Sequence, residues 1–205
     1  MLKAPPTTFT ATAQAAAVRP PLVEAIVLAG GLSRRMGRDK ARLRVGGRSL
    51  LRRSGDAARA LGIPVRVLRR DQVPRCGPLG GVCTALQRSS SEVVLFLSCD
   101  MPSVLPDLLQ RLLARLTARR DAVFVESEGW VGFPFAIRGR ARETVWRLHR
   151  EGRFSLQSVA EQLHAARLRV GRACRDQLLN VNTPEAWKSY AASLRDRLAS
   201  KSKGA

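Results

Sequence analysis

The chain has 205 residues, of which 45% are hydrophobic, enough for one globular domain of ordinary size. No apolar run approaches the roughly 20 residues needed to span a bilayer, so we expect a soluble protein without membrane segments. Lys and Arg number 36 against 16 Asp and Glu, and the formal net charge of +20 favours an anionic partner such as a nucleotide or a nucleic acid. An alternative is that the scattered arginines lie on solvated helix faces and need no partner.

The two ends of the chain differ in composition from the middle. Residues 1–20 are rich in Ala, Thr and Pro, which predicts a disordered leader, and residues 199–205 are expected to form a flexible tail. The leader lacks the apolar segment of a secretory signal, and its lack of acidic residues leaves a transit peptide open. We expect residues 21–198 to form a single domain.

The cysteines and histidines show no pattern of a metal site. The cysteines have no C-x-x-C pair and no zinc-like spacing, which favours small buried thiols in a reducing cytoplasm. They are Cys76, Cys83, Cys99 and Cys174. His149 and His164 both fall in helix-like stretches, so neither a histidine metal site nor a histidine general base is expected.

Strand-like and helix-like segments alternate along the chain. Strands are predicted at 23–29, 63–69, 92–98, 121–127, 130–138 and 166–171. Helices are predicted at 49–61, 79–89, 105–116, 139–150 and 155–165, with a last one after Thr183. The alternation predicts an α/β fold with three α/β/α layers around a mostly parallel sheet. Ligands of such sheets bind beyond the carboxyl ends of the strands.

The first strand ends in a glycine pair followed by cations. Gly30 and Gly31 would let backbone N–H groups approach phosphate oxygens, and Arg35 and Lys40 could neutralise the same phosphates. The segment matches neither the P-loop nor the G-x-G-x-x-G dinucleotide pattern. A tight turn alone would also explain the glycines, but the added cations favour a phosphate-binding loop.

The second strand leads into a loop that could receive a flat base. Gly77 and Pro78 open "GPLGG" before a helix, and backbone without side chains there could lie against a ring. Asp71 could accept hydrogen bonds from the two adjacent donors of guanine, which adenine and cytosine do not offer together. The alternative for Asp71 is a solvated loop acid.

Two later loops carry oxygen ligands. Asp100 follows the apolar strand 92–98 and is placed to hold Mg²⁺, although it could also cap a turn. Asn180 and Asn182 would point to the same side of a strand and offer amide groups to a substrate or metal. The alternative makes Asn182 a turn residue, and Thr183 is expected to be the N-cap of the last helix.

The motifs "LAGGLSRRMGRDKA", "GPLGG", "CDMP" and "NVNTPEAW" together resemble the molybdenum cofactor guanylyltransferases, over about residues 22–190. The resemblance implies a nucleotide-diphospho-sugar transferase-like (Rossmann-like) fold. It also implies Mg²⁺-dependent transfer of GMP from GTP to the terminal phosphate of molybdopterin, with release of pyrophosphate.

The resemblance also implies roles for single residues. Asp71 would bind guanine, Asp100 would bind the metal, and Asn180 and Asn182 would lie on the cofactor side. Apart from the resemblance, charge neutralisation assigns Arg35 and Lys40 to the leaving pyrophosphate, with Mg²⁺ on Asp100, so these three residues are the expected catalytic set. The nucleotide-binding set would be Leu28, Ala29, Gly30, Gly31, Lys40, Asp71, Gly77, Pro78 and Asp100. The implied partners are GTP and molybdopterin, with molybdoenzymes or cofactor-insertion proteins as further candidates for the basic surface.

Two segments depart from the family pattern. The stretch between the first predicted helix and Gly77 is short for the family, which usually has an extra strand there, and "GFPFAIR" stands where the family tends to have a polar residue before its Pro. Three alternatives stay open: a cytidylyl-, uridylyl- or adenylyltransferase, a family member that binds nucleotide without turnover, and a basic nucleic-acid-binding module. The last is disfavoured by an aromatic content of only 5% and the lack of an RNA- or DNA-binding motif.

Overall fold

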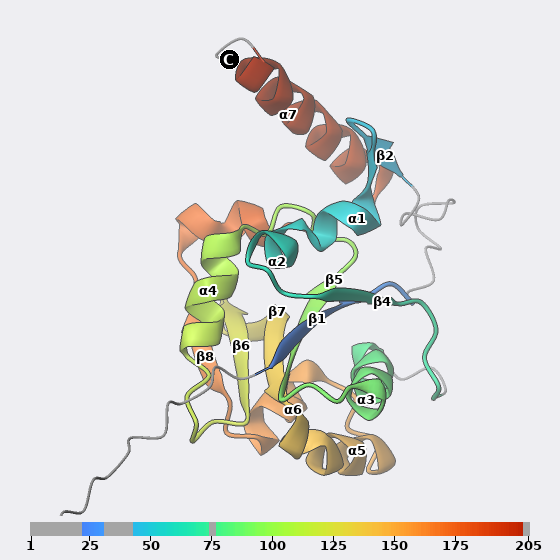
Figure 1. The fold of residues 1–205 in the computed structure, drawn as a ribbon, viewed down its shortest axis with the longest axis vertical. Helices are drawn as coiled ribbons and strands as arrows, with labels where there is room; N and C mark the ends of the chain where they lie inside the picture. Colours follow the sequence, from blue (N-terminus) through green and yellow to red (C-terminus); the bar gives the residue numbers. More distant parts are fainter. Residues whose placement is uncertain (1–21, 31–42, 74–76, 203–205) are drawn as a thin grey trace, which may run out of the picture.

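The computed structural model describes residues 22–30, 43–73 and 77–202. Within these ranges six strands form one sheet in the order β4-β1-β5-β7-β6-β8 (Figure 1). The sheet strands are β1 (Val23–Leu28), β4 (Val65–Leu68), β5 (Val93–Ser98), β6 (Ala122–Ser127), β7 (Trp130–Arg138) and β8 (Ala166–Arg169). Strands β2 (Arg44–Val45) and β3 (Arg48–Ser49) form a separate hairpin.

The described helices are α1 (Leu50–Ser54), α2 (Asp56–Ala60), α3 (Pro78–Arg88), α4 (Pro106–Ala114), α5 (Arg142–Arg150), α6 (Leu156–Gln162) and α7 (Pro184–Ser202). Two 3₁₀ segments, η3 (Gly139–Ala141) and η4 (Arg172–Leu178), join them. Figure 1 shows α1, α2 and α4 on one side of the sheet and α3, α5 and α6 on the other. The predicted three-layer arrangement is confirmed.

The sheet is mostly parallel, as predicted. Strand β1 runs parallel to β4 and β5, and β6 runs parallel to β8, whereas β7 is antiparallel to both of its neighbours. The inversion arises because β7 follows β6 through the two-residue turn Glu128-Gly129, whose φ values are 54° and 83°. Two successive positive φ angles are typical of the type I′ turn that matches the twist of a hairpin.

A hydrophobic core covers each face of the sheet. On one face, alternate residues of the central strands pack against Leu108, Leu109 and Leu112 of α4. On the other face the rings of Phe96, Phe124 and Phe135 stack in a row, with centroids 4.8 and 4.6 Å apart. Strand β5 contributes to both cores, which explains its uninterrupted apolar sequence.

Two predicted elements are corrected by the structure. The helix expected at 49–61 is two short helices, because the chain bends at Gly55, where a β-carbon would lie only 3.0 Å from Cγ1 of Val65. The strand expected around Asn180 and Asn182 does not form: residues 179–182 are irregular and pair with no strand of the described sheet. The β2–β3 hairpin was not predicted, although Gly46-Gly47 marks its turn.

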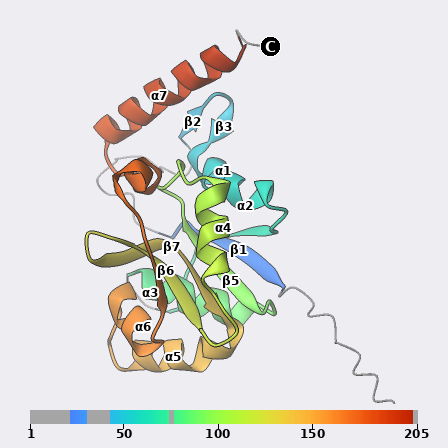
Figure 2. The ribbon, with the colours of Figure 1, turned by 90° about the vertical axis from the view of Figure 1, so that its left-hand side faces the viewer.

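The last helix leaves the body of the domain. Figure 2 shows α7 beyond the β2–β3 hairpin, at the opposite end of the molecule from α5 and α6. Thr183 caps it as predicted, since its Oγ1 accepts a hydrogen bond from the Ala186 N–H at 3.2 Å. Across the described ranges, none of the helices combines the length and the apolarity needed to cross a membrane.

Candidate active site

The carboxyl ends of β4, β1 and β5 lie next to one another. Leu28, the last residue of β1, is in register with Leu68 of β4 and Ser98 of β5. The ladder continues one step further, because the Ala29 N–H donates to the Leu68 carbonyl at 2.8 Å and the Cys99 N–H donates to the Leu28 carbonyl at 3.2 Å. The loops that begin at Gly30, Arg69 and Cys99 therefore start side by side.

The structure brings Asp71 together with the glycines predicted to bind nucleotide. A β-carbon added at Gly30 would lie 3.4 Å from Oδ1 of Asp71, and one added at Gly81 would lie 3.3 Å from the same oxygen. The Gly81 β-carbon would also lie 3.1 Å from Cδ1 of Leu28. Partial burial in this position raises the pKa of the Asp71 carboxyl. Asp71 thus lies beside Gly30 and Gly81 while its side chain stays exposed to solvent, and both readings of it, base contact and solvated loop acid, stay predictions.

Thr84 of α3 fixes the loop that carries Asp71. Its hydroxyl donates to the Gly80 carbonyl at 2.8 Å and accepts from the Gln72 N–H at 2.9 Å. The side chain is fully buried, so neither bond competes with water. Sequence reasoning missed Thr84. The available signal was that Thr84 is a lone polar residue on the apolar face of a helix. That signal does not show which backbone groups its hydroxyl binds.

At the start of α3, Pro78 occupies the first helical turn and Gly77 has a φ of 63°. An L-residue with a side chain rarely adopts that φ, so glycine is required where the chain turns into the helix. Both residues are exposed, which leaves this corner of the site open to a ligand.

Asp100 is held by contacts from three parts of the chain. The Ser98 hydroxyl donates to Oδ1 of Asp100 at 2.5 Å, and the Asp100 carbonyl accepts from the Val181 N–H at 2.8 Å. The preceding carbonyl, that of Cys99, accepts from the buried hydroxyl of Ser54 at 2.9 Å. Neither Ser54 nor Ser98 was predicted as a site residue. For Ser54 the reason is that nothing in the sequence shows that α1 packs against this turn.

Asn180 and Asn182 flank the contact with Asp100. Val181 between them is buried, Asn182 is half-buried and Asn180 is exposed. The Val181 contact places Asn180 and Asn182 beside the Asp100 loop, in an irregular segment instead of the predicted strand. Their role in substrate binding stays a prediction.

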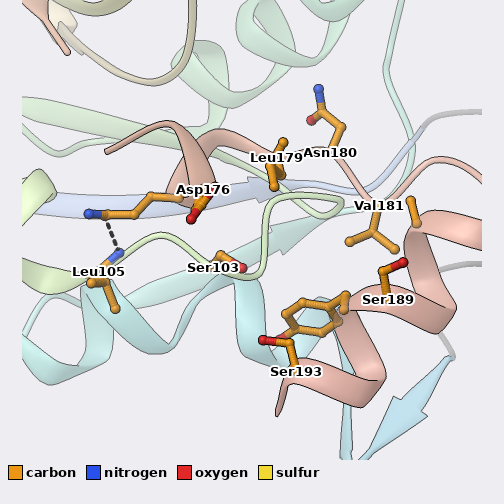
Figure 3. A pocket seen from close by; sticks show the side chains of 11 residues that line it. Ser103, Leu105, Asp176, Leu179, Asn180, Val181, Ser189 and Ser193 are labelled. Carbon is orange, nitrogen blue, oxygen red and sulfur yellow. Dashed lines mark hydrogen bonds between the residues drawn. The ribbon is translucent and has the colours of Figure 1, made fainter. Parts of the chain in front are cut away.

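Asn180 borders two hollows. One of about 300 Å³ lies at the β6–β7 hairpin, and one of about 650 Å³ lies between η4 and α7. Figure 3 shows the larger one, in which the Asn180 amide points away from Ser189 and Ser193 on α7. Asn180 therefore lines the hollow on the side away from α7.

A protein-only metal cage is not found in the described residues, where no three His, Cys, Asp or Glu side chains cluster. Asp100 fits Mg²⁺ in another way, since Mg²⁺ is commonly held by one or two carboxylates together with substrate phosphates and water. Gly31, Arg35 and Lys40, predicted to bind those phosphates, lie outside the described residues, as do Cys76 and the leader 1–20.

A mostly parallel α/β/α sheet with glycine-walled loops and carboxylates at its carboxyl edge defines a nucleotide-binding protein of the nucleotidyltransferase fold class. Residues 25–71 and 61–168 match the model of the MobA-like NTP transferase domain. The chain belongs to this family, which confirms the family and the fold class expected from the sequence.

Relatives and solved structures agree with this assignment. A probable molybdenum cofactor guanylyltransferase of Synechococcus elongatus is 31% identical over 193 residues, covering 82% of this chain and 98% of the relative. One of Opitutus terrae is 32% identical over 181 residues, covering 78% and 90%.

Among solved structures, molybdopterin-guanine dinucleotide biosynthesis protein A from Archaeoglobus fulgidus matches with a TM-score of 0.66 at 20% identity, over 85% of this chain and 99% of that one. 2-C-methyl-D-erythritol 4-phosphate cytidylyltransferase from Thermus thermophilus matches with a TM-score of 0.62 at 19% identity, over 83% and 98%. The fold alone therefore does not select the base.

Proposed function

We propose that this protein transfers GMP from GTP to the terminal phosphate of molybdopterin, forming the guanine dinucleotide cofactor and pyrophosphate. The observation that carries the proposal is the position of Asp71, whose carboxylate lies beside Gly30 and Gly81 at the carboxyl edge of the sheet. An ionised carboxylate accepts hydrogen bonds and donates none, so it suits the adjacent N–H donors of guanine. The relatives named as guanylyltransferases point to the same nucleotide.

The chemistry needs no general base from the protein. The attacking group is a phosphate monoester, whose second pKa of about 6 makes it largely a dianion at neutral pH. His149 is instead engaged in packing, with its ring 5.6 Å from Trp146 and 5.5 Å from Phe154 between centroids. Catalysis then reduces to aligning two polyanions and neutralising their charge.

Asp100 has the main charge-organising role in this proposal. The Ser98 hydroxyl orients its carboxylate, and the contact of its backbone with Val181 ties it to the Asn180–Asn182 segment. A Mg²⁺ ion bound there would neutralise phosphate charge as the bond to pyrophosphate breaks. We assign Arg35 and Lys40 to the leaving pyrophosphate, on the grounds of their register after Gly30-Gly31.

Nucleotide choice tests the proposal. Pyrophosphate release is measured with Mg²⁺ and GTP, CTP, UTP or ATP, each with and without molybdopterin. Release that needs both GTP and molybdopterin supports it. A preference for CTP would retain the fold and the chemistry but remove guanine recognition by Asp71, and no release with any nucleotide would contradict the proposed activity.

A further inference from the structure

The β6–β7 hairpin carries the most exposed large apolar side chain among the described residues, Trp130, at 73%. Trp130 begins β7 and pairs with Ser127 across the Glu128-Gly129 turn. A single exposed apolar side chain is common on protein surfaces, so Trp130 points to a ligand only through the hollow that it borders. Figure 2 shows the hairpin extending from the sheet.

Trp130 is at the edge of the hollow of about 300 Å³ described above. Gly132 lies in its lining, and a β-carbon placed there would meet nothing within 4 Å, so the space beside the indole is open. Phe133 lines the same space and is supported by Phe135, with ring centroids 5.0 Å apart. Met101 and Leu178 complete an apolar slot between the hairpin and η4.

Ion pairs hold the hairpin in position. Glu128 at the turn contacts Arg175 of η4 at 2.7 Å. Glu126, nearly buried, contacts Arg167 and Arg169 of β8 at 2.7 and 2.8 Å. The Glu126 pairs join the hairpin to β8, whereas the exposed Glu128–Arg175 pair, which adds little stability, is the contact between the hairpin turn and η4.

The slot lies on the acceptor side of the candidate active site. Asp71 and Gly30 lie at the ends of β4 and β1, whereas the slot lies at β7 and β6, and β5 with Asp100 separates the two. Met101, next to Asp100, and Asn180, next to the residue that binds the Asp100 carbonyl, both line the slot. A ligand in it would reach Asp100 from the side opposite the guanine loop.

We propose that Trp130 stacks on the pterin ring system of the acceptor, with Gly132 and Phe133 shaping the slot that receives it. The inference rests on the proposed function, since it assigns an acceptor-binding residue for that reaction. Indole is the strongest aromatic partner for a flat heterocycle, and Asn180 at the rim can hydrogen-bond to ring edges. Base-on-aromatic stacking typically changes affinity by roughly 5- to 100-fold.

The test compares Trp130→Ala, Trp130→Phe and Gly132→Val. We expect Trp130→Ala to raise the KM for molybdopterin about tenfold, with the KM for GTP and kcat at saturating acceptor unchanged, and Trp130→Phe to recover most of the loss. Gly132→Val fills the slot and should raise the same KM while Trp130 is retained. Leu105→Ala, another exposed apolar side chain on the α7 hollow, is the matched control and should behave as wild type.

A second readout separates this inference from the proposed function. Molybdopterin alone is titrated into wild type and the variants by calorimetry, without nucleotide. We expect the dissociation constant to rise about tenfold in Trp130→Ala, whether or not the wild type transfers GMP. A wild type that fails to transfer GMP contradicts the proposed function. Unchanged acceptor affinity and KM in both Trp130→Ala and Gly132→Val overturn the stacking role, as would an equal rise in the KM for GTP.

Discussion

Replacing Asp71 by asparagine changes the base pocket with almost no change in shape. One carboxylate oxygen becomes an NH₂ group, so a donor would face a donor of guanine. Oδ1 of Asp71 lies beside Gly30 and Gly81, 3.4 and 3.3 Å from the positions that their β-carbons would take, so the new amide group would stay at the same edge of the site. Hydrogen bonds to charged groups contribute about 1.5–3 kcal/mol, and the half-open position of Asp71 places the loss near the lower end.

A loss of about 1.5 kcal/mol corresponds to a little more than tenfold in affinity. We therefore expect Asp71→Asn to weaken GTP binding about tenfold, measured by calorimetry, and to lower kcat/KM for GTP by a similar factor with CTP unaffected. Asp107→Asn, an exposed acid in the first turn of α4, is the control and should leave both quantities unchanged. Unchanged GTP affinity in Asp71→Asn would refute guanine recognition by this residue.

The remaining predictions concern charge, pH and packing. Asp100→Ala and Lys40→Ala should each lower turnover by about 10²-fold or more in the pyrophosphate assay, and near-wild-type turnover would remove the residue from the active site. Because burial raises the pKa of Asp71, GTP affinity should be full above that pKa and be lost as pH falls through it, at a higher pH than a solvated aspartate would give. Calorimetric titrations across the acid range would show this loss of GTP affinity in wild type. The same acid-dependent loss in Asp71→Asn would contradict the assignment of Asp71 to guanine binding. Phe135→Ala removes the ring that contacts Phe96, Phe124 and Phe133, so we expect a loss of about 3–5 kcal/mol in a urea unfolding experiment, and a loss below 1 kcal/mol would contradict the stacked core.

The sequence predicted the fold well where the local spacing of apolar residues matched the burial that each element has in the folded chain. The apolar run of β5 and the leucine stripe of α4 were recognised because burial on two faces and burial on one face leave different spacings. The break at Gly55 was missed because the need for a glycine there comes from the space left by Arg59 and by Val65, which belongs to another element. The segment 179–182 was interpreted as a strand because its side chains alternate, although its backbone bonds to the Asp100 turn and not to the sheet.

In the candidate site, too, local sequence features could be predicted and tertiary contacts could not. The placement of Gly30, Asp71 and Asp100 at one edge of the sheet could be predicted because each follows a strand, and parallel strands gather such loops at one edge. Thr84, Ser54 and Ser98 could not, since they act by binding backbone groups that only the folded chain brings near. The exposure of Trp130 also escaped prediction, because strand periodicity does not show that a hairpin extends beyond the helices covering the sheet.

The central claim is guanylyl transfer to molybdopterin, and nucleotide-dependent pyrophosphate release tests it most directly. The account predicts release with Mg²⁺, GTP and molybdopterin together, little without molybdopterin, and at least tenfold less when CTP, UTP or ATP replaces GTP. Equal release with CTP, or release with GTP that does not depend on molybdopterin, would contradict it.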